Sequence, residues 1–158
     1  MRQLEPFPNL VSMFFTRARE QGDAPFLWHK EGGSWHSISW ADAAHQVASL
    51  ATGLRAAGLA PGDRVMLVSE NRPEWCISDL AIMAAGCVTV PTYVTNTERD
   101  HLHIIDNSES RAIIVSNAKL AKTVMPAALR SGVPQVVIGI EPIRAGQPGN
   151  LAFYDWNT

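Results

Sequence analysis

Apolar residues in the first 58 positions recur at helical spacing in two segments. Leu10, Phe14 and Ala18 share one face of a segment that ends at Gly22, which predicts a first helix. Apolar residues again share one face between positions 39 and 58, where a serine followed three residues later by an aspartate resembles a capping box. We therefore predict a second helix that packs on its neighbours by one side.

Between these helices, "PFLWHK" and "SWHSIS" flank the turn "EGG". Glycine tolerates the positive φ of tight turns, so the pattern predicts a small antiparallel hairpin. His29 and His36 are expected to face each other across it, but a zinc site would need further ligands that the sequence does not identify. Three tryptophans near the hairpin are expected to form core or interface: Trp28, Trp35 and Trp40.

Beyond the turn "APGD", short apolar runs alternate with helical patterns. Short, continuous apolar strands separated by helices favour parallel pairing with both sheet faces covered. The predicted fold class is therefore α/β, with a parallel, doubly wound sheet, flanking helices and the antiparallel hairpin. Strands are predicted at 64–69, 87–91, 111–116 and 133–140, and helices at 74–85, 98–108 and 118–130.

The final segment, 141–158, loses this periodicity and gathers Pro, Gly, Gln and Asn. Such composition is typical of a loop or linker. We therefore expect an N-terminal α/β subdomain over 1–140, followed by a linker or the start of a further segment over 141–158. The chain is expected to be the front part of a longer protein.

Composition and charge exclude several classes of function. The net charge is −2 and the 13 Lys and Arg residues are scattered, so no basic stripe indicates a nucleic-acid partner. The N-terminus lacks the apolar stretch of a secretory signal, and no apolar run approaches the ~20 residues that cross a bilayer. Cys76 and Cys87 lie near opposite ends of a predicted helix and are expected about 15 Å apart, too far for a disulfide. These features indicate a cytoplasmic protein with free thiols.

Ligands of open parallel sheets bind beyond the carboxyl ends of the strands, so the informative loops follow Ser69, Val90, Ser116 and Ile140. The first loop begins "SENRPEW". Its proline suits a first helical turn, its glutamate complements the helix dipole, and its serine or asparagine could cap the helix. This segment is therefore interpreted mainly as a structural corner, with ligand contact by its asparagine and arginine as the alternative.

No complete catalytic constellation occurs in the sequence. It contains neither G-x-G-x-x-G nor G-x-x-x-x-G-K-[ST], which bind phosphates, and no G-x-S-x-G elbow. His101 and His103 point to different sides of a helix, so with Asp106 they indicate a solvated face rather than a metal site. We assign no catalytic residue and no metal ligand.

The segment "GDRVMLVSENRPEWCISDLAIMAAGCVTVPTYVTNT" closely resembles the N-terminal part of AMP-forming acyl-CoA synthetases, especially long-chain fatty acid CoA ligases. Looser similarity extends over most of 10–140. "ENRPEW" and "AGCVTVPTY" carry the resemblance to the acyl-CoA branch of this adenylate-forming family. The motif residues interpreted as structural are Asn71, Arg72, Pro73, Glu74 and Trp75.

The resemblance implies a parent enzyme that uses ATP, Mg²⁺ and CoA to convert a fatty acid into acyl-CoA, AMP and pyrophosphate. The family's "TSGTTG-PKG"-like phosphate loop is not in this sequence, so no cofactor is expected to bind this chain alone. Family members tend to have "VP-YPT-T" where this chain has "VPTYVTNT", with Val94 in place of proline. The resemblance makes Thr92, Tyr93, Thr95 and Thr97 candidate substrate contacts, with capping of the next helix as the alternative.

The sequence therefore predicts a scaffold fragment of a long-chain fatty acid CoA ligase, inactive alone, whose partner is the rest of the ligase chain. Two alternatives stay open: a non-catalytic binding or dimerisation module, and part of an adenylating enzyme for another carboxylic acid. Exposed apolar surface makes a homodimer possible. Membrane contact is expected to be at most peripheral. The coding sequence after Thr158 would separate the ligase from the free-standing module.

Overall fold

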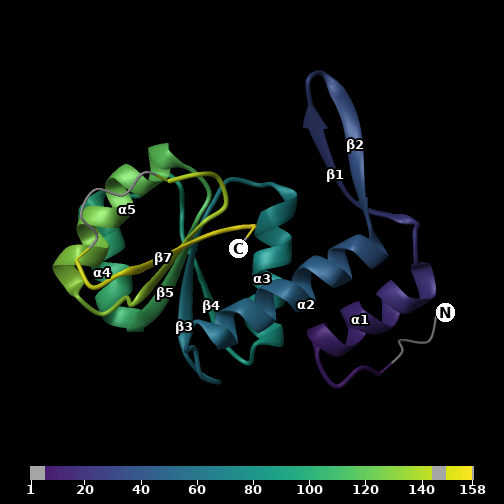
Figure 1. Ribbon diagram of the computed structural model, residues 1–158, viewed down its shortest axis with the longest axis horizontal. Coiled ribbons are helices and arrows are strands. Elements are labelled where there is room, and N and C mark those ends of the chain that lie inside the picture. The colour runs from purple at the N-terminus through teal and green to yellow at the C-terminus, as the bar shows by residue number, and fades with distance from the viewer. Residues whose placement is uncertain (1–5, 144–148, 158) are drawn as a thin grey trace.

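The computed structural model describes residues 6–143 and 149–157 (Figure 1). The helices are α1 (Leu10–Gln21), α2 (Trp40–Ala56), α3 (Pro73–Ala84), α4 (Glu98–Ser108) and α5 (Ala118–Ser131). The strands are β1 (Pro25–Glu31), β2 (Ser34–Ser39), β3 (Arg64–Val68), β4 (Val88–Pro91), β5 (Ser110–Val115), β6 (Val136–Gly139) and β7 (Ala152–Asp155).

Five strands form one parallel sheet in the order β4-β3-β5-β6-β7. The chain runs from β3 to one neighbour, β4, and then returns past β3 to β5 on its other side. This reversal makes the carboxyl ends of β3 and β5 the topological switch point of the sheet, where open α/β folds usually bind ligands. The predicted α/β class with a doubly wound parallel sheet and a separate hairpin is confirmed.

The interpretation of the tail as loop or linker is wrong at 152–155, which form strand β7, whereas the alternative, the start of a further segment, stays a prediction. Ala152 to Asp155 pair with Val136 to Gly139, and the amide of Trp156 donates to the Gly139 carbonyl at 2.9 Å. Phe and Tyr within this segment suit a strand, although its flanking polar residues obscure the pattern. Residues 144–148 of the predicted linker lie outside the described residues, and the division at residue 140 stays a prediction.

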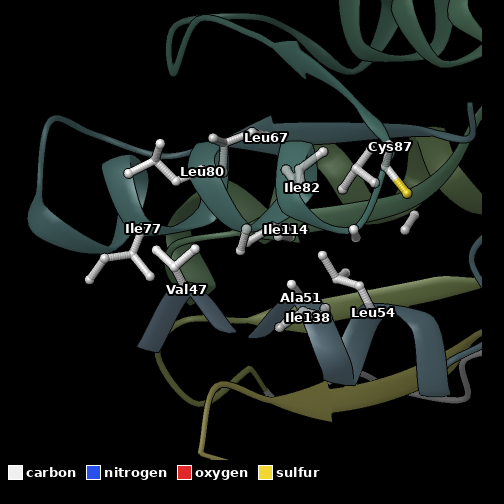
Figure 2. Packing of buried hydrophobic residues seen from close by; sticks show 14 of the residues in the cluster. Val47, Ala51, Leu54, Leu67, Ile77, Leu80, Ile82, Cys87, Ile114 and Ile138 are labelled. Carbon is white, nitrogen blue, oxygen red and sulfur yellow. The ribbon is translucent and has the colours of Figure 1, made fainter. Parts of the chain in front are cut away.

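Two apolar cores lie on opposite faces of the sheet. On one face, Val47 and Leu54 of α2 and Ile77 and Ile82 of α3 point toward one another over Ile114 of the sheet (Figure 2). On the other face, α4 and α5 cover a second core. Its fully buried members are Met66, Val68, Ile105, Ile113, Val115, Val124, Ala127, Ala128 and Val137. Helices packed on both faces hold the strands in place, and so they fix where the loops at the strand ends begin.

Side-chain caps begin four of the five helices in the described part of the chain. Asn9, Ser39, Thr97 and Asn117 each accept a hydrogen bond from an amide in the first turn of the helix that follows. Such caps satisfy donors that have no partner within the helix. Helix α3 differs because Arg72 precedes it with no side-chain cap bond, and Pro73 occupies its first position. Proline there removes one donor that would otherwise need a partner.

The hairpin β1–β2 projects beyond the helices and the sheet (Figure 1). Aromatic packing fixes its base, where the rings of Phe26 and Trp40 lie 3.8 Å apart between centroids. His29 pairs with His36 in register, as predicted, and their ring centroids are 5.7 Å apart. Trp40 belongs to the core margin, whereas Trp28 and Trp35 are exposed.

One polar residue departs from its expected position. His101 was expected on a solvated face, but it is fully buried and neither ring nitrogen has a hydrogen-bond partner. Burial lowers the pKa of its imidazole, against the smaller effect of neighbouring Asp100. The reason is amphipathic geometry: His101 lies one turn before the buried Ile105 and therefore shares its face. Cys76 and Cys87, as expected, are free thiols.

Candidate functional site

The carboxyl edge of the sheet brings together three of the four loops that the sequence indicated. Glu70 follows β3, Ser116 and Asn117 follow β5, and Glu141 follows β6. The amide of Glu141 donates to the Ser116 carbonyl at 2.9 Å, which joins the last two loops. The edge is therefore a connected surface rather than a set of separate turns.

Glu70 lies at the switch point and bridges the ends of β3 and β5. The Ser116 hydroxyl donates to Glu70 Oε2 at 2.5 Å, and Asn117 Nδ2 donates to Glu70 Oε1 at 2.9 Å. Partial burial would raise the pKa of Glu70, but these bonds and the nearby Arg72 hold it below the ordinary value. Glu70 is thus an ionised carboxylate with both oxygens engaged.

Arg72 is the second anchor of this edge. Its Nε donates to Glu74 Oε2 at 2.8 Å, and its Nη1 donates to Glu141 Oε1 at 2.6 Å. The bonds to Glu74 raise the pKa of the guanidinium well above its ordinary value. Burial lowers this pKa by less, and the bond to Glu141 raises it further. Burial alone would raise the pKa of Glu74, but its hydrogen bond with Arg72 and the charge of Arg72 help to hold it below its ordinary value. The positive charge of Arg72 is therefore matched by two carboxylates within the chain.

The rest of "SENRPEW" forms the wall of a small cavity beside the hairpin. Pro73 is buried and Trp75 is half-buried. A cavity of about 350 Å³ is lined by Leu27, Trp28, Asn71, Arg72, Pro73, Trp75 and Cys76. The expected cap by Ser69 or Asn71 is wrong, because Ser69 Oγ donates to the Glu70 carbonyl at 2.9 Å and α3 has no side-chain cap. Because the connection between β3 and Pro73 is short, Arg72 occupies the position just before the helix, where a capping residue would lie.

The loop at 92–97 does not gather its four candidate residues into one site. Tyr93 is 80% exposed and Thr95 is exposed, whereas the Thr92 hydroxyl is buried without a partner. Thr97 forms a reciprocal capping box with Asp100, in which the Asp100 amide donates to Thr97 Oγ1 at 3.4 Å and the Thr97 amide donates to the Asp100 carboxylate at 2.9 Å. Capping therefore accounts for Thr97, and substrate contact by the others stays a prediction.

The described residues show no assembled site for a magnesium nucleotide. Within 6–143 and 149–157 there is no group of three His, Cys, Asp or Glu side chains that could hold a metal ion, and Arg72 at the carboxyl edge is paired with Glu74 and Glu141. The sequence has no glycine-rich phosphate loop to direct several amides at an anion. No adenylation step can be derived from these side chains.

Sequence reasoning located this edge but missed the residues that organise it. The available signal was position: Ser116 ends a predicted strand, and Glu70, Asn117 and Glu141 each follow directly after one. Their mutual contacts depend on strand order, which local patterns do not specify.

A family comparison settles the class of protein. The family model of the AMP-binding enzymes matches residues 14–154. The chain belongs to this family. Over 126 residues, 80% of this chain, it is 35% identical to the long-chain-fatty-acid–CoA ligase FadD15 of Mycobacterium tuberculosis. It is also 33% identical to the mitochondrial acyl-coenzyme A synthetase ACSM5 of Homo sapiens over 126 residues. The resemblance identified from the sequence is confirmed.

Two solved structures share the fold of this chain. Acetoacetyl-CoA synthetase from Streptomyces lividans superposes with a TM-score of 0.80 over 93% of this chain, at 25% identity. The adenylation domain of a carboxylate reductase from Mycobacterium chelonae gives 0.81 over 97%, at 13% identity. The chain spans about a fifth of the FadD15 sequence and about a quarter of each structure: 21%, 24% and 28%.

Proposed function

We propose that this chain is a framework unit of an AMP-forming acyl-CoA ligase that acts on long-chain fatty acids. The parent reaction joins a fatty acid to CoA through ATP, with release of AMP and pyrophosphate. In this proposal the chain supplies the sheet and the carboxyl-edge anchors, and other parts of the parent bind ATP, Mg²⁺ and CoA. The similarity to FadD15 supports the choice of a long-chain acid.

One observation carries the framework role. The polar groups at the switch point are paired with one another: Glu70 with Ser116 and Asn117, and Arg72 with Glu74 and Glu141. Ligand-binding side chains need hydrogen-bonding capacity that the protein has not already used. These two paired sets are suited to hold three strand ends in fixed relation rather than to activate a substrate.

The first experiment measures pyrophosphate release by the purified 158-residue chain supplied with ATP, Mg²⁺, CoA and palmitate. We expect no release above the enzyme-free rate, while a long-chain acyl-CoA ligase assayed in parallel turns over. Calorimetric titration with magnesium–ATP is expected to give no binding heat. Turnover by the chain, or saturable nucleotide binding, would refute the framework role.

The substrate class requires a separate test because relatives with other acids are also similar. An acyl-CoA ligase azaF and a phenylacetyl-CoA ligase epaB, both from Aspergillus niger, are 34% and 33% identical to this chain. The test is the substrate profile of the parent enzyme across fatty and aromatic acids. Preference for an aromatic or short acid would replace the long-chain assignment and leave the framework role intact.

A binding or dimerisation module remains the second candidate, and a specific surface favours it. Helix α2, strands β6 and β7 and the residues just after β7 line an open cavity of about 590 Å³. Its apolar lining includes Leu50, Ile138 and Trp156. Such a surface is suited to contact with another protein segment. Light scattering on the purified chain checks this candidate, since only monomer at high concentration would oppose self-association.

A further inference from the structure

The projecting hairpin has two chemically different faces. Trp28 and Lys30 lie two positions apart on β1, while Trp35 is paired with Lys30 and Ser37 with Trp28 on β2. Residues at this spacing and register share one side of a two-stranded sheet. We define Trp28, Lys30, Trp35 and Ser37 as the tryptophan face.

Both indole rings on this face meet solvent. Trp28 is 56% exposed and Trp35 is 66% exposed, whereas Trp40, at the base of the hairpin, packs against Phe26. Tryptophan is highly buried on average in folded proteins, so two exposed rings on one face of a hairpin require an explanation. The hairpin base does not need them, because Phe26 and Trp40 already join it to the core.

Charge is distributed unequally between the two faces. Lys30 is the charged residue of the tryptophan face. Glu31, His29 and His36 lie on the opposite face, where His29 Nε2 is 3.7 Å from Glu31 Oε2. Indole rings together with a lysine match the interface of a lipid bilayer, where tryptophan lies among headgroups and lysine meets anionic phosphates.

The small area of this face favours a membrane over a protein as its partner. A tryptophan side chain buries at most about 250 Å², so two partly exposed rings offer far less than the ~800 Å² per partner of a standard protein interface. A bilayer requires no such minimum from a peripheral anchor. Within the described residues no helix is both long and apolar enough to cross a membrane, so membrane contact there would have to be made by a surface.

We propose that the tryptophan face docks at the interface of an anionic lipid bilayer. The hairpin lies beside the carboxyl edge of the sheet, since Leu27 and Trp28 share a cavity with Asn71 and Arg72. Docking therefore brings the lipid surface close to the corner formed by "SENRPEW". The inference is independent of the ligase proposal, because it concerns lipid binding by this chain without turnover.

The experiment is co-sedimentation of the purified chain with vesicles of phosphatidylcholine, alone or mixed with phosphatidylglycerol. We expect binding to the mixed vesicles, and the double variant Trp28→Ser, Trp35→Ser should lower the partition coefficient about tenfold. Lys30→Gln should weaken binding to the mixed vesicles and leave binding to phosphatidylcholine alone unchanged. Tyr154→Ser, which removes an aromatic ring 40% exposed on β7, is the matched control and should bind as the original chain does.

Thermal unfolding of each variant verifies that the fold is retained, as the exposed positions predict. Failure of the original chain to sediment with either vesicle would overturn the inference, as would equal binding by the double variant. A dimer that dissociates in the double variant, with vesicle binding unchanged, would instead assign the tryptophan face to a second copy of the chain.

Discussion

The loops at 69–72 and 92–97 leave the same edge of the sheet but use their polar residues differently. In the first, the carboxylate of Glu70 and the guanidinium of Arg72 each bridge to other segments of the chain. In the second, Tyr93 points to solvent, and Thr97 bonds only within the start of its own helix.

Strand order explains this difference. Strand β3 has neighbours on both sides, so its loop meets the loops that follow β5 and β6. Strand β4 is at the edge of the sheet, and its loop is joined to the sheet by the amide of Thr92, which donates to the Leu67 carbonyl at 3.0 Å. The loop after the central strand β3 therefore uses its polar residues to join segments of the chain. The loop after the edge strand β4 leaves its polar residues accessible to a ligand.

The largest effect is expected from Arg72→Ala. It leaves the carboxylates of Glu74 and Glu141 without their cation, so the free energy of unfolding should fall by about 2 kcal/mol. For a chain of this length the melting temperature should fall by roughly 4–8 °C. Arg72→Lys keeps the charge but not the fork of donors and should recover part of the loss. Unchanged melting of the alanine variant would show that the first loop is not an anchor.

Glu70→Ala should cost about 1 kcal/mol, a modest value because the carboxylate is exposed to solvent. The lowered pKa of Glu70 stabilises the fold above its ordinary value of 4.5, and this contribution is lost as the pH falls through the folded-state pKa. Glu70→Gln can retain hydrogen bonds without that ionisation. Denaturant unfolding between neutral and acidic pH should therefore show a smaller pH dependence in the glutamine variant, and identical pH profiles would contradict the role of Glu70.

His101→Leu should stabilise the chain by about 1 kcal/mol, since it removes two buried nitrogens without partners. Below the ordinary imidazole pKa of 6.5, the unfolded chain takes up a proton that the buried ring resists, so the original chain loses stability as the pH falls. The leucine variant should lose this dependence. His103→Gln changes the exposed histidine on the same helix and is the control, which should retain it.

Thr97→Ala removes the side chain that accepts from the Asp100 amide, and caps of this kind contribute about 1 kcal/mol. Thr95→Ala, two residues earlier in the same loop, changes an exposed hydroxyl and serves as its matched control. Equal melting temperatures for the two variants would be evidence against the capping assignment.

The smallest effect on stability is expected at Tyr93. Because its ring is 80% exposed, Tyr93→Ala should change the free energy of unfolding by less than about 0.5 kcal/mol. If Tyr93 contacts substrate, the same change in the parent ligase should raise KM for the acid. An unchanged KM, with stability also unchanged, would remove Tyr93 from the candidate contacts.

The sequence predicted the elements well because their apolar patterns are local. The positions of Pro73 and of the strand ends followed from short-range chemistry. The burial of His101 was not predicted, because a polar side chain suggests an exposed helix face. Its position one turn before the buried Ile105 was the better indicator. The pairing of Glu70 with Ser116 joins residues 46 positions apart, and it depends on which strands become neighbours. Strand β7 was missed because four residues carry little periodicity.

Gly139 shows how a residue without a side chain supports the charged contacts at this edge. It ends β6, and a Cβ built there would lie 2.8 Å from the Glu141 carbonyl oxygen and 2.9 Å from Cδ1 of Ile143. The chain can therefore fold back tightly after the strand, which carries Glu141 over to Arg72. A methyl group added here would have to displace the backbone of this bend, so the contact between Arg72 in the middle third of the chain and Glu141 in the last third depends on a residue that has only hydrogen at this position.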